Sequence, residues 1–93
     1  MHARVATFEF GDGMEQMVEQ VREDSQAGRR PAGLEDAVGM TMLVDRESGK
    51  GMAIVFFETA EEMMRGDAVL NGMSPSGPSR RTGVEFYEVA VQS

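Results

Sequence analysis

Few side chains in this sequence are able to bind or transform a small molecule, and four stand out by type and position. Tyr87 is the only tyrosine, and its hydroxyl could donate a proton or a hydrogen bond to a bound quinol or carbonyl. Arg4 could hold an anionic group, and strand alternation places it on the same face as Phe8. Phe8 and Phe57 would supply apolar walls. We therefore predict that any ligand-binding site is built from Arg4, Phe8, Phe57 and Tyr87.

Each polar member of this set also has a structural interpretation, which is the more common one in proteins. A tyrosine on a strand usually packs its ring and leaves its hydroxyl at the rim of the core. An arginine there more often pairs with a nearby carboxylate than with a substrate. The single histidine, His2, lies among the first residues of the chain, where we expect it to be exposed. No Ser-His-Asp or Cys-His arrangement is evident, so no catalytic residue is assigned.

The acidic side chains do not form a metal-binding pattern. Eight of the sixteen fall on predicted helix surfaces and near loops, at Glu15, Glu19, Glu23, Asp24, Glu35, Asp36, Glu61 and Glu62. This distribution is typical of solvated faces and of acidic residues in the first turns of helices. No spacing matches a calcium loop, and the sequence contains no cysteine. We therefore predict neither a metal nor a cofactor.

Composition limits the class of protein. The chain has 93 residues, of which 41% are hydrophobic, so we predict one domain over residues 1–93. Nine basic residues against sixteen acidic ones give a net charge of −7, which argues against non-specific binding to nucleic acid. No apolar run approaches the roughly 18 residues of a membrane span, and no signal-peptide pattern is present. We expect a cytoplasmic protein without membrane association.

Four segments are predicted as strands, namely residues 4–10, 40–45, 51–58 and 84–91. β-branched and aromatic residues recur in these segments between turn signals. The polar loop 46–50 joins the middle two as a hairpin, with Gly49 available for a positive φ.

Two helices are predicted between the strands. The first follows Asp12, which we expect to cap it, and ends at Gly28 with Pro31 just beyond. Its inward stripe has helical spacing and consists of Met14, Met17, Val18 and Val21. The second begins with a capping box formed by Thr59 and Glu62 and runs to about residue 70. Its expected inner residues are Ala60, Met63, Met64 and Ala68. The methionines of both helices either fill gaps in the core or form an adaptable wall for a flat apolar ligand.

This order of elements predicts an α+β, ferredoxin-like βαββαβ fold, with a four-stranded antiparallel sheet and both helices on one face. The third strand is nevertheless apolar on both faces, because Met52, Ile54 and Phe56 alternate with Ala53, Val55 and Phe57. A half-exposed antiparallel strand would alternate apolar and polar residues. Two helices can cover only one face, so we predict a homodimer in which the open sheet faces pack together. The alternative is that the strands are apolar by propensity, with an open face less apolar than this count suggests.

Four short stretches carry a family resemblance: residues 4–9 (RVATFE), 43–50 (LVDRESGK), 56–59 (FFET) and 87–91 (YEVAV). Together they resemble the antibiotic biosynthesis monooxygenase-like superfamily of dimeric α+β barrels, over nearly the whole chain. The resemblance implies a homodimer whose pockets, between sheet and helices, bind aromatic polyketides, quinones or haem. It also implies cofactor-free oxygenation or haem degradation as activities.

The chain departs from that family at specific positions. Phe57, Glu58 and Thr59 stand where many members have Trp-Glu-Ser. Ala6 stands where the haem-degrading branch has an asparagine, and the second helix lacks the histidine that binds haem iron in that branch. These departures argue against haem degradation and leave monooxygenase-like chemistry on a small aromatic molecule as the implied activity.

Residues 50–57 (KGMAIVFF) also fit much of the RNA-recognition-motif signature. In that module two aromatic residues on the open sheet face stack on bases. Met52 and Ile54 occupy those positions here and cannot stack, and the chain carries a net charge of −7. We therefore predict no nucleic-acid partner and place an RNA-binding module last among the functions considered.

Two functions stay open. The first is a small homodimeric α+β barrel protein that binds a small apolar or aromatic molecule, with a monooxygenase-like activity that no specific residue supports. The second is a non-catalytic dimerisation or interaction protein, favoured by the shortage of titratable residues at inward-facing strand positions. No motif encodes the identity of a ligand.

Overall fold

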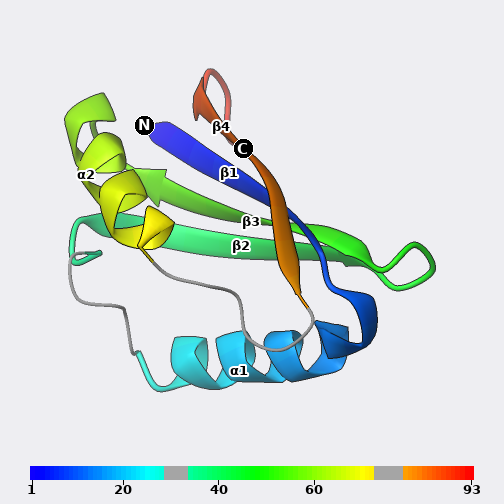
Figure 1. Cartoon of the computed structure of the whole chain (residues 1–93). Helices are drawn as coiled ribbons and strands as arrows, with labels where there is room; N and C mark the ends of the chain where they lie inside the picture. The colour runs from blue at the N-terminus through cyan, green and yellow to red at the C-terminus, as the bar shows by residue number, and fades with distance from the viewer. Residues whose placement is uncertain (29–33, 73–78) are drawn as a thin grey trace.

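A computed structural model of the chain describes residues 1–28, 34–72 and 79–93 (Figure 1). The four strands are β1 (His2–Glu9), β2 (Ala37–Asp45), β3 (Lys50–Phe57) and β4 (Arg80–Glu88). The two helices are α1 (Met14–Gln26) and α2 (Ala60–Asn71), and a 3₁₀ turn, η1 (Gly11–Gly13), precedes α1. The predicted βαββαβ order is confirmed.

The strands form one antiparallel sheet in the order β2-β3-β1-β4. Val55 of β3 lies opposite Arg4 of β1 and Met40 of β2, and Arg4 in turn lies opposite Phe86 of β4. These four side chains therefore share one face of the sheet. Both helices lie on this face, since Gly66 of α2 approaches Phe57 and α1 lies over β2. The predicted ferredoxin-like α+β fold is confirmed.

β1 and β3 lie within two residues of their predicted bounds, whereas β2 and β4 differ from theirs by three residues or more. β4 begins at Arg80 and ends at Glu88, instead of spanning residues 84–91. At its polar start β4 pairs with the end of β1, where Arg80 lies opposite Glu9 and Arg80 Nη2 lies 2.5 Å from Glu9 Oε2. Beyond the strand, the Val89 amide donates to the Met1 carbonyl at 2.9 Å and Val91 is 88% exposed. β2 begins three residues early, at Ala37, and its register shifts between Ala37 and Gly39.

The helix starts show one correct and one wrong prediction. The Thr59 hydroxyl accepts a hydrogen bond from the Glu62 amide at 3.1 Å, so the predicted cap of α2 is confirmed. Asp12 does not cap α1, because it lies inside η1 and Gly13 is the N-cap residue, without a side-chain hydrogen bond. The hairpin between β2 and β3 turns at Gly49, whose φ is +73°, as the sequence predicts.

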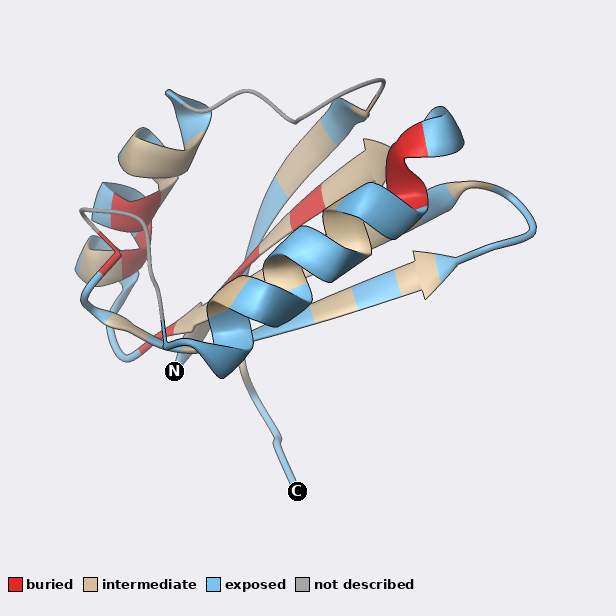
Figure 2. Cartoon of the chain, turned by 90° about the horizontal axis from the view of Figure 1, so that it is seen from below, coloured by how far each residue is buried: buried red, intermediate tan, exposed pale blue. Residues whose placement is uncertain are grey.

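The core lies under α2. Its buried members are Leu34, Val55, Phe57 and Met63. The prediction of the inner face of α2 is wrong in part, since Ala60, Met64 and Ala68 are exposed. Gly66 takes their place, because a Cβ there would lie 2.4 Å from Cζ of the Phe57 ring. The absence of a side chain at Gly66 thus lets α2 approach the sheet closely, and Figure 2 shows the buried part of this helix on its sheet side.

No helix within the described residues is long and apolar enough to cross a membrane.

Candidate ligand-binding cleft

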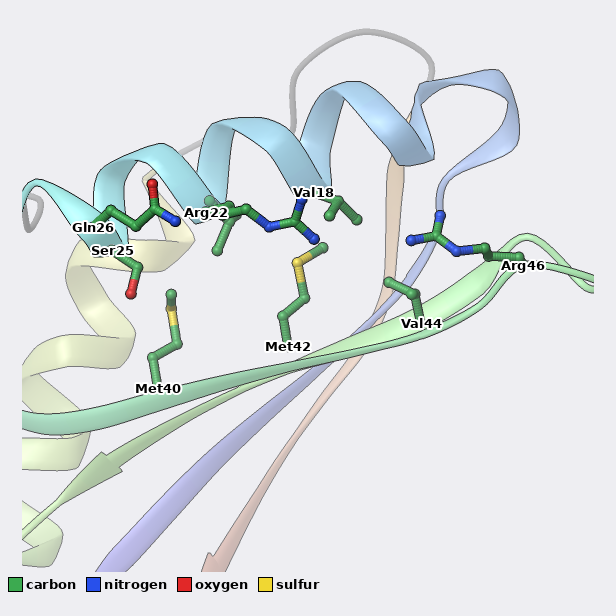
Figure 3. Close-up of a pocket in the computed structure, with 9 residues that line it drawn as sticks. Val18, Arg22, Ser25, Gln26, Met40, Met42, Val44 and Arg46 are labelled. Atoms are coloured by element: carbon green, nitrogen blue, oxygen red, sulfur yellow. The ribbon is translucent and has the colours of Figure 1, made fainter.

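A cleft of about 440 Å³ separates α1 from β2 (Figure 3). On the strand side Met40, Met42 and Val44 alternate with outward-facing residues, and the two methionines rise toward the helix. On the helix side the wall is formed by Val18 and Val21, which belong to the predicted inward stripe. The remaining lining residues are polar or charged: Arg22, Ser25, Gln26 and Arg46.

The cleft exists because α1 is attached to the sheet mainly at its beginning. Phe10 is 1% exposed and packs over Gly51, where a Cβ would lie 2.6 Å from the phenylalanine ring. Met14, the first residue of α1, follows Phe10 by four residues and is the only buried residue of the helix. Further along, α1 presents Val18 and Val21, whose side chains are too short to fill the space above β2.

A second cleft of about 650 Å³ adjoins the first, since both are lined by Val21, Ser25 and Met40. It extends beneath the end of α1 toward the core, where Leu34 and Val55 contribute apolar walls. Small residues at the start of β2, Ala37 and Gly39, leave room at this end. Clefts of a few hundred Å³ with mostly apolar walls are the usual size for small-molecule sites.

The charged side chains at the first cleft are two arginines. Arg22 projects from α1 and pairs with Glu19 at 3.0 Å, while Arg46 follows β2 and pairs with Glu15. All four side chains are more than half exposed, so solvent screens these pairs and they stabilise the fold little. Asp24 lines the second cleft and not the first. The first cleft therefore carries its basic groups beside its methionines.

Arg4, predicted as a ligand contact, is buried in a hydrogen-bonded network between β1 and α2. Its Nε lies 2.8 Å from Asp67 Oδ1, and its Nη2 donates to Asn71 Oδ1 at 3.4 Å. Asn71 completes the network by donating to the other Asp67 oxygen at 3.1 Å. Arg4 therefore pairs with a carboxylate, which is the structural interpretation given above. Only 3% of its side chain is exposed.

The other predicted contacts lie apart from the two clefts. Phe57 is fully buried against α2, and Phe8 stacks on Phe10 with ring centroids 5.7 Å apart. Tyr87 lies on the opposite face of the sheet, because it faces Ala3 of β1, whereas Arg4 faces Phe86. Arg4, Phe8, Phe57 and Tyr87 line neither cleft.

The environments of Tyr87 and His2 also bear on their predicted roles. The Tyr87 hydroxyl donates to the Glu85 carboxylate, and this hydrogen bond with the adjacent negative charge raises the pKa of the phenol above its ordinary 10.0. The phenol is thereby a weaker proton donor. His2 is the first residue of β1 and lies opposite Phe57. It is half-buried, so the prediction that it is exposed is wrong.

Several cleft residues belong to patterns that the sequence shows, but these patterns do not place them in one binding site. Val18 and Val21 stood in the predicted stripe of the first helix, and Met40 and Met42 alternate along the second strand. The signal that could have found the cleft is the pairing of a helix stripe of short side chains with a strand face of long flexible ones. Arg22 and Arg46 gave no local signal, since isolated arginines are ordinary surface residues.

Within the described residues, no group of three or more histidine, aspartate or glutamate side chains is placed to hold a metal ion. The chain matches no protein-family model and no curated protein sequence.

Proposed function

We propose that this protein binds a small apolar or aromatic molecule in the cleft between α1 and β2. The observation that carries the proposal is the set of apolar side chains facing one another across a space of about 440 Å³. Met40 and Met42 suit such a ligand, because thioethers are flexible and make favourable contacts with aromatic rings. Filling the cleft would remove apolar surface from water on both walls.

The resemblance to the dimeric α+β barrels supports an aromatic ligand, since pockets between sheet and helices bind such molecules in that superfamily. The described cleft residues supply apolar walls and positive charge, so binding is the activity proposed. A monooxygenase-like reaction would require the ligand itself to react with oxygen once it is oriented and shielded from water.

The test uses the neutral fluorophore N-phenyl-1-naphthylamine and a matched pair of variants. Met40 and Met64 are both 50% exposed, but only Met40 lines the clefts. We expect the dye to brighten with the wild-type protein, Met40→Gln to weaken its binding several-fold, and Met64→Gln to leave it unchanged. Equal effects of the two variants, or no brightening with the wild type, would contradict the proposal.

A control on the opposite sheet face separates the cleft from other apolar surface. Leu43 is 49% exposed and, because it lies opposite Met52, faces away from both helices. We expect Leu43→Gln to bind the dye as the wild type does. If Leu43→Gln lost dye binding and Met40→Gln kept it, the dye would bind on the sheet face without helices and not in the cleft.

We further propose that the protein is a homodimer through this open face, defined by Val5, Thr7, Leu43, Met52, Ile54, Phe56 and Tyr87. Both helices lie on the other side of the sheet. Leu43 and Tyr87 are about half exposed in the single chain, and a second copy of the same face would cover them. Apolar patches of this kind commonly mark interaction surfaces.

Sedimentation velocity at micromolar concentration tests the dimer with another matched pair. The wild type is expected to sediment as a particle of twice the 10.2 kDa chain mass. Leu43→Lys should shift it toward the single chain, because a charge buried in the interface would be unpaired. Met40→Lys, at the same exposure on the helix side, should keep the dimer. A dimer that binds no dye would favour the alternative function, a non-catalytic dimerisation protein.

A further inference from the structure

We infer that the cleft takes an amphipathic organic anion, with its apolar body against Met40 and Met42 and its carboxylate or sulfonate group at Arg22 and Arg46. This inference rests on the proposed function, since it names the chemical class of the ligand for that same cleft. It replaces Arg4, which is closed off by Asp67 and Asn71, with two arginines that line the space itself.

The two arginines come from different elements and both line this cleft. Arg22 belongs to α1, and Figure 3 draws its guanidinium above Met42. Arg46 follows the end of β2, next to Val44, and its side chain reaches up from the strand toward the helix side. A charged group placed above Val44, at the end of a ligand that rests on the methionines, would lie between these two guanidinium groups.

The present partners of these arginines are weak competitors for a bound anion. Each arginine contacts one glutamate of α1 through Nη1, Arg22 with Glu19 and Arg46 with Glu15. A guanidinium has five N–H donors and can grip a carboxylate through two of them at once. Because both ion pairs are more than half exposed, water screens them, whereas a ligand in the cleft would exclude water from its own contacts.

The charge of the whole chain makes this placement specific. The sequence has only nine basic residues against sixteen acidic ones, and two of the nine line this single cleft. The net charge of −7 repels an anion from the chain as a whole, so a bound anion needs direct contact with basic side chains such as these two. A neutral or cationic ligand would gain no charge pairing from these two side chains.

A matched pair of dyes tests the inference. 8-Anilinonaphthalene-1-sulfonate and N-phenyl-1-naphthylamine share one aromatic skeleton and differ by the sulfonate group. We expect the sulfonate dye to bind the wild type more tightly, and Arg22→Gln combined with Arg46→Gln to weaken it about tenfold. Binding of the neutral dye should change little. Added salt should weaken only the sulfonate dye.

Two further variants complete the design. Arg65→Gln combined with Arg80→Gln removes the same charge from exposed ion pairs that do not line the cleft, and should leave both dyes unaffected. Glu15→Gln combined with Glu19→Gln removes the competing carboxylates and should tighten the sulfonate dye several-fold. This gain cannot arise from misfolding.

The outcomes separate the two proposals. If neither dye binds the wild type, both the proposed function and this inference are overturned. If both dyes bind but the sulfonate dye does not depend on Arg22 and Arg46 more than the neutral dye does, only the inference is overturned. Equal losses in the cleft and control arginine variants would also overturn it, since the effect would then come from net charge alone.

Discussion

The two helices lie on the same face of the sheet but meet it in different ways. α2 buries Met63 and Gly66, and the ring of Phe57 occupies the place where a side chain at Gly66 would stand. α1 buries only its first residue, Met14, and two clefts lie between its inner surface and the sheet. Figure 2 shows the contrast, since buried residues colour the sheet side of α2 but only the beginning of α1.

Side-chain size at the contact explains the difference. A glycine lets a helix backbone approach a large aromatic ring, so α2 and β3 pack without a gap. Valines facing methionines across the cleft leave α1 standing away from β2. The α2 end of the molecule therefore supplies stability, and the α1 end supplies space that a ligand could fill without disturbing the core.

Truncation of the core ring should give the largest contrast between the two ends. Phe57→Ala removes a fully buried ring and should lower the free energy of unfolding by about 3–5 kcal/mol. Val21→Ala, on the cleft wall, should cost less than about 1 kcal/mol, because the space beside it is already open. Urea denaturation followed by circular dichroism measures both. Similar losses at the two sites would show that α1 is packed as tightly as α2.

The buried ion pair beneath α2 should give the next largest effect. Asp67→Asn keeps the shape of the side chain but leaves Arg4, 3% exposed, without its counter-charge, at a cost of about 1.5–3 kcal/mol. Asp36→Asn is the matched control, because Asp36 pairs with Arg65 and both are about half exposed; it should cost less than about 1 kcal/mol. Equal midpoints in urea for the two variants would mean that the Arg4 pair adds nothing to the attachment of α2.

Alanine at one position in each helix should act with opposite sign. Gly66→Ala gains about 1 kcal/mol of helix propensity, but its Cβ would meet the Phe57 ring, so we expect a net loss of about 1–2 kcal/mol. Ser25→Ala faces the cleft and should be neutral or stabilise by up to about 0.5 kcal/mol. Thermal unfolding of the two variants measures the signs. Stabilisation by Gly66→Ala would disprove the close approach of α2.

Local chemistry made much of the fold predictable. The Thr59 cap, the turn at Gly49 and the helical stripe from Met14 to Val21 each depend on a few neighbouring residues, and each is present in the structure. On the inner face of α2 the prediction was wrong because a distant contact decided the outcome. Gly66 was not among the residues expected on the inner face of its helix, yet it lies against Phe57 there.

The site was harder to predict because it depends on how separate elements face one another. Alternation along a strand groups Phe8 with Arg4, but only the register between β1 and β4 places Tyr87 on the other face. The cleft likewise depends on the distance between α1 and β2, which no residue of either element sets alone. The ion pair between Arg4 and Asp67 likewise forms between residues far apart in the chain, so local sequence does not predict it.

On the face of the sheet without helices, we expect the smallest effect, a change in the pKa of Tyr87. This pKa can be measured without interference from other residues. Tyr87 is the only tyrosine and the chain has no tryptophan, so ultraviolet absorbance of the phenolate reports this residue alone. Its hydrogen bond to Glu85 and the adjacent negative charge raise its pKa above 10.0, and Glu85→Gln should return the pKa toward 10.0. Because the folded-state pKa is the higher one, this contribution to stability is complete below pH 10 and is lost as the pH rises through the folded-state pKa. A Tyr87 pKa that rises further with protein concentration would indicate that Tyr87 is buried against a second copy of the chain. A Tyr87 pKa of 10.0 in both the wild type and Glu85→Gln would contradict the contact with Glu85.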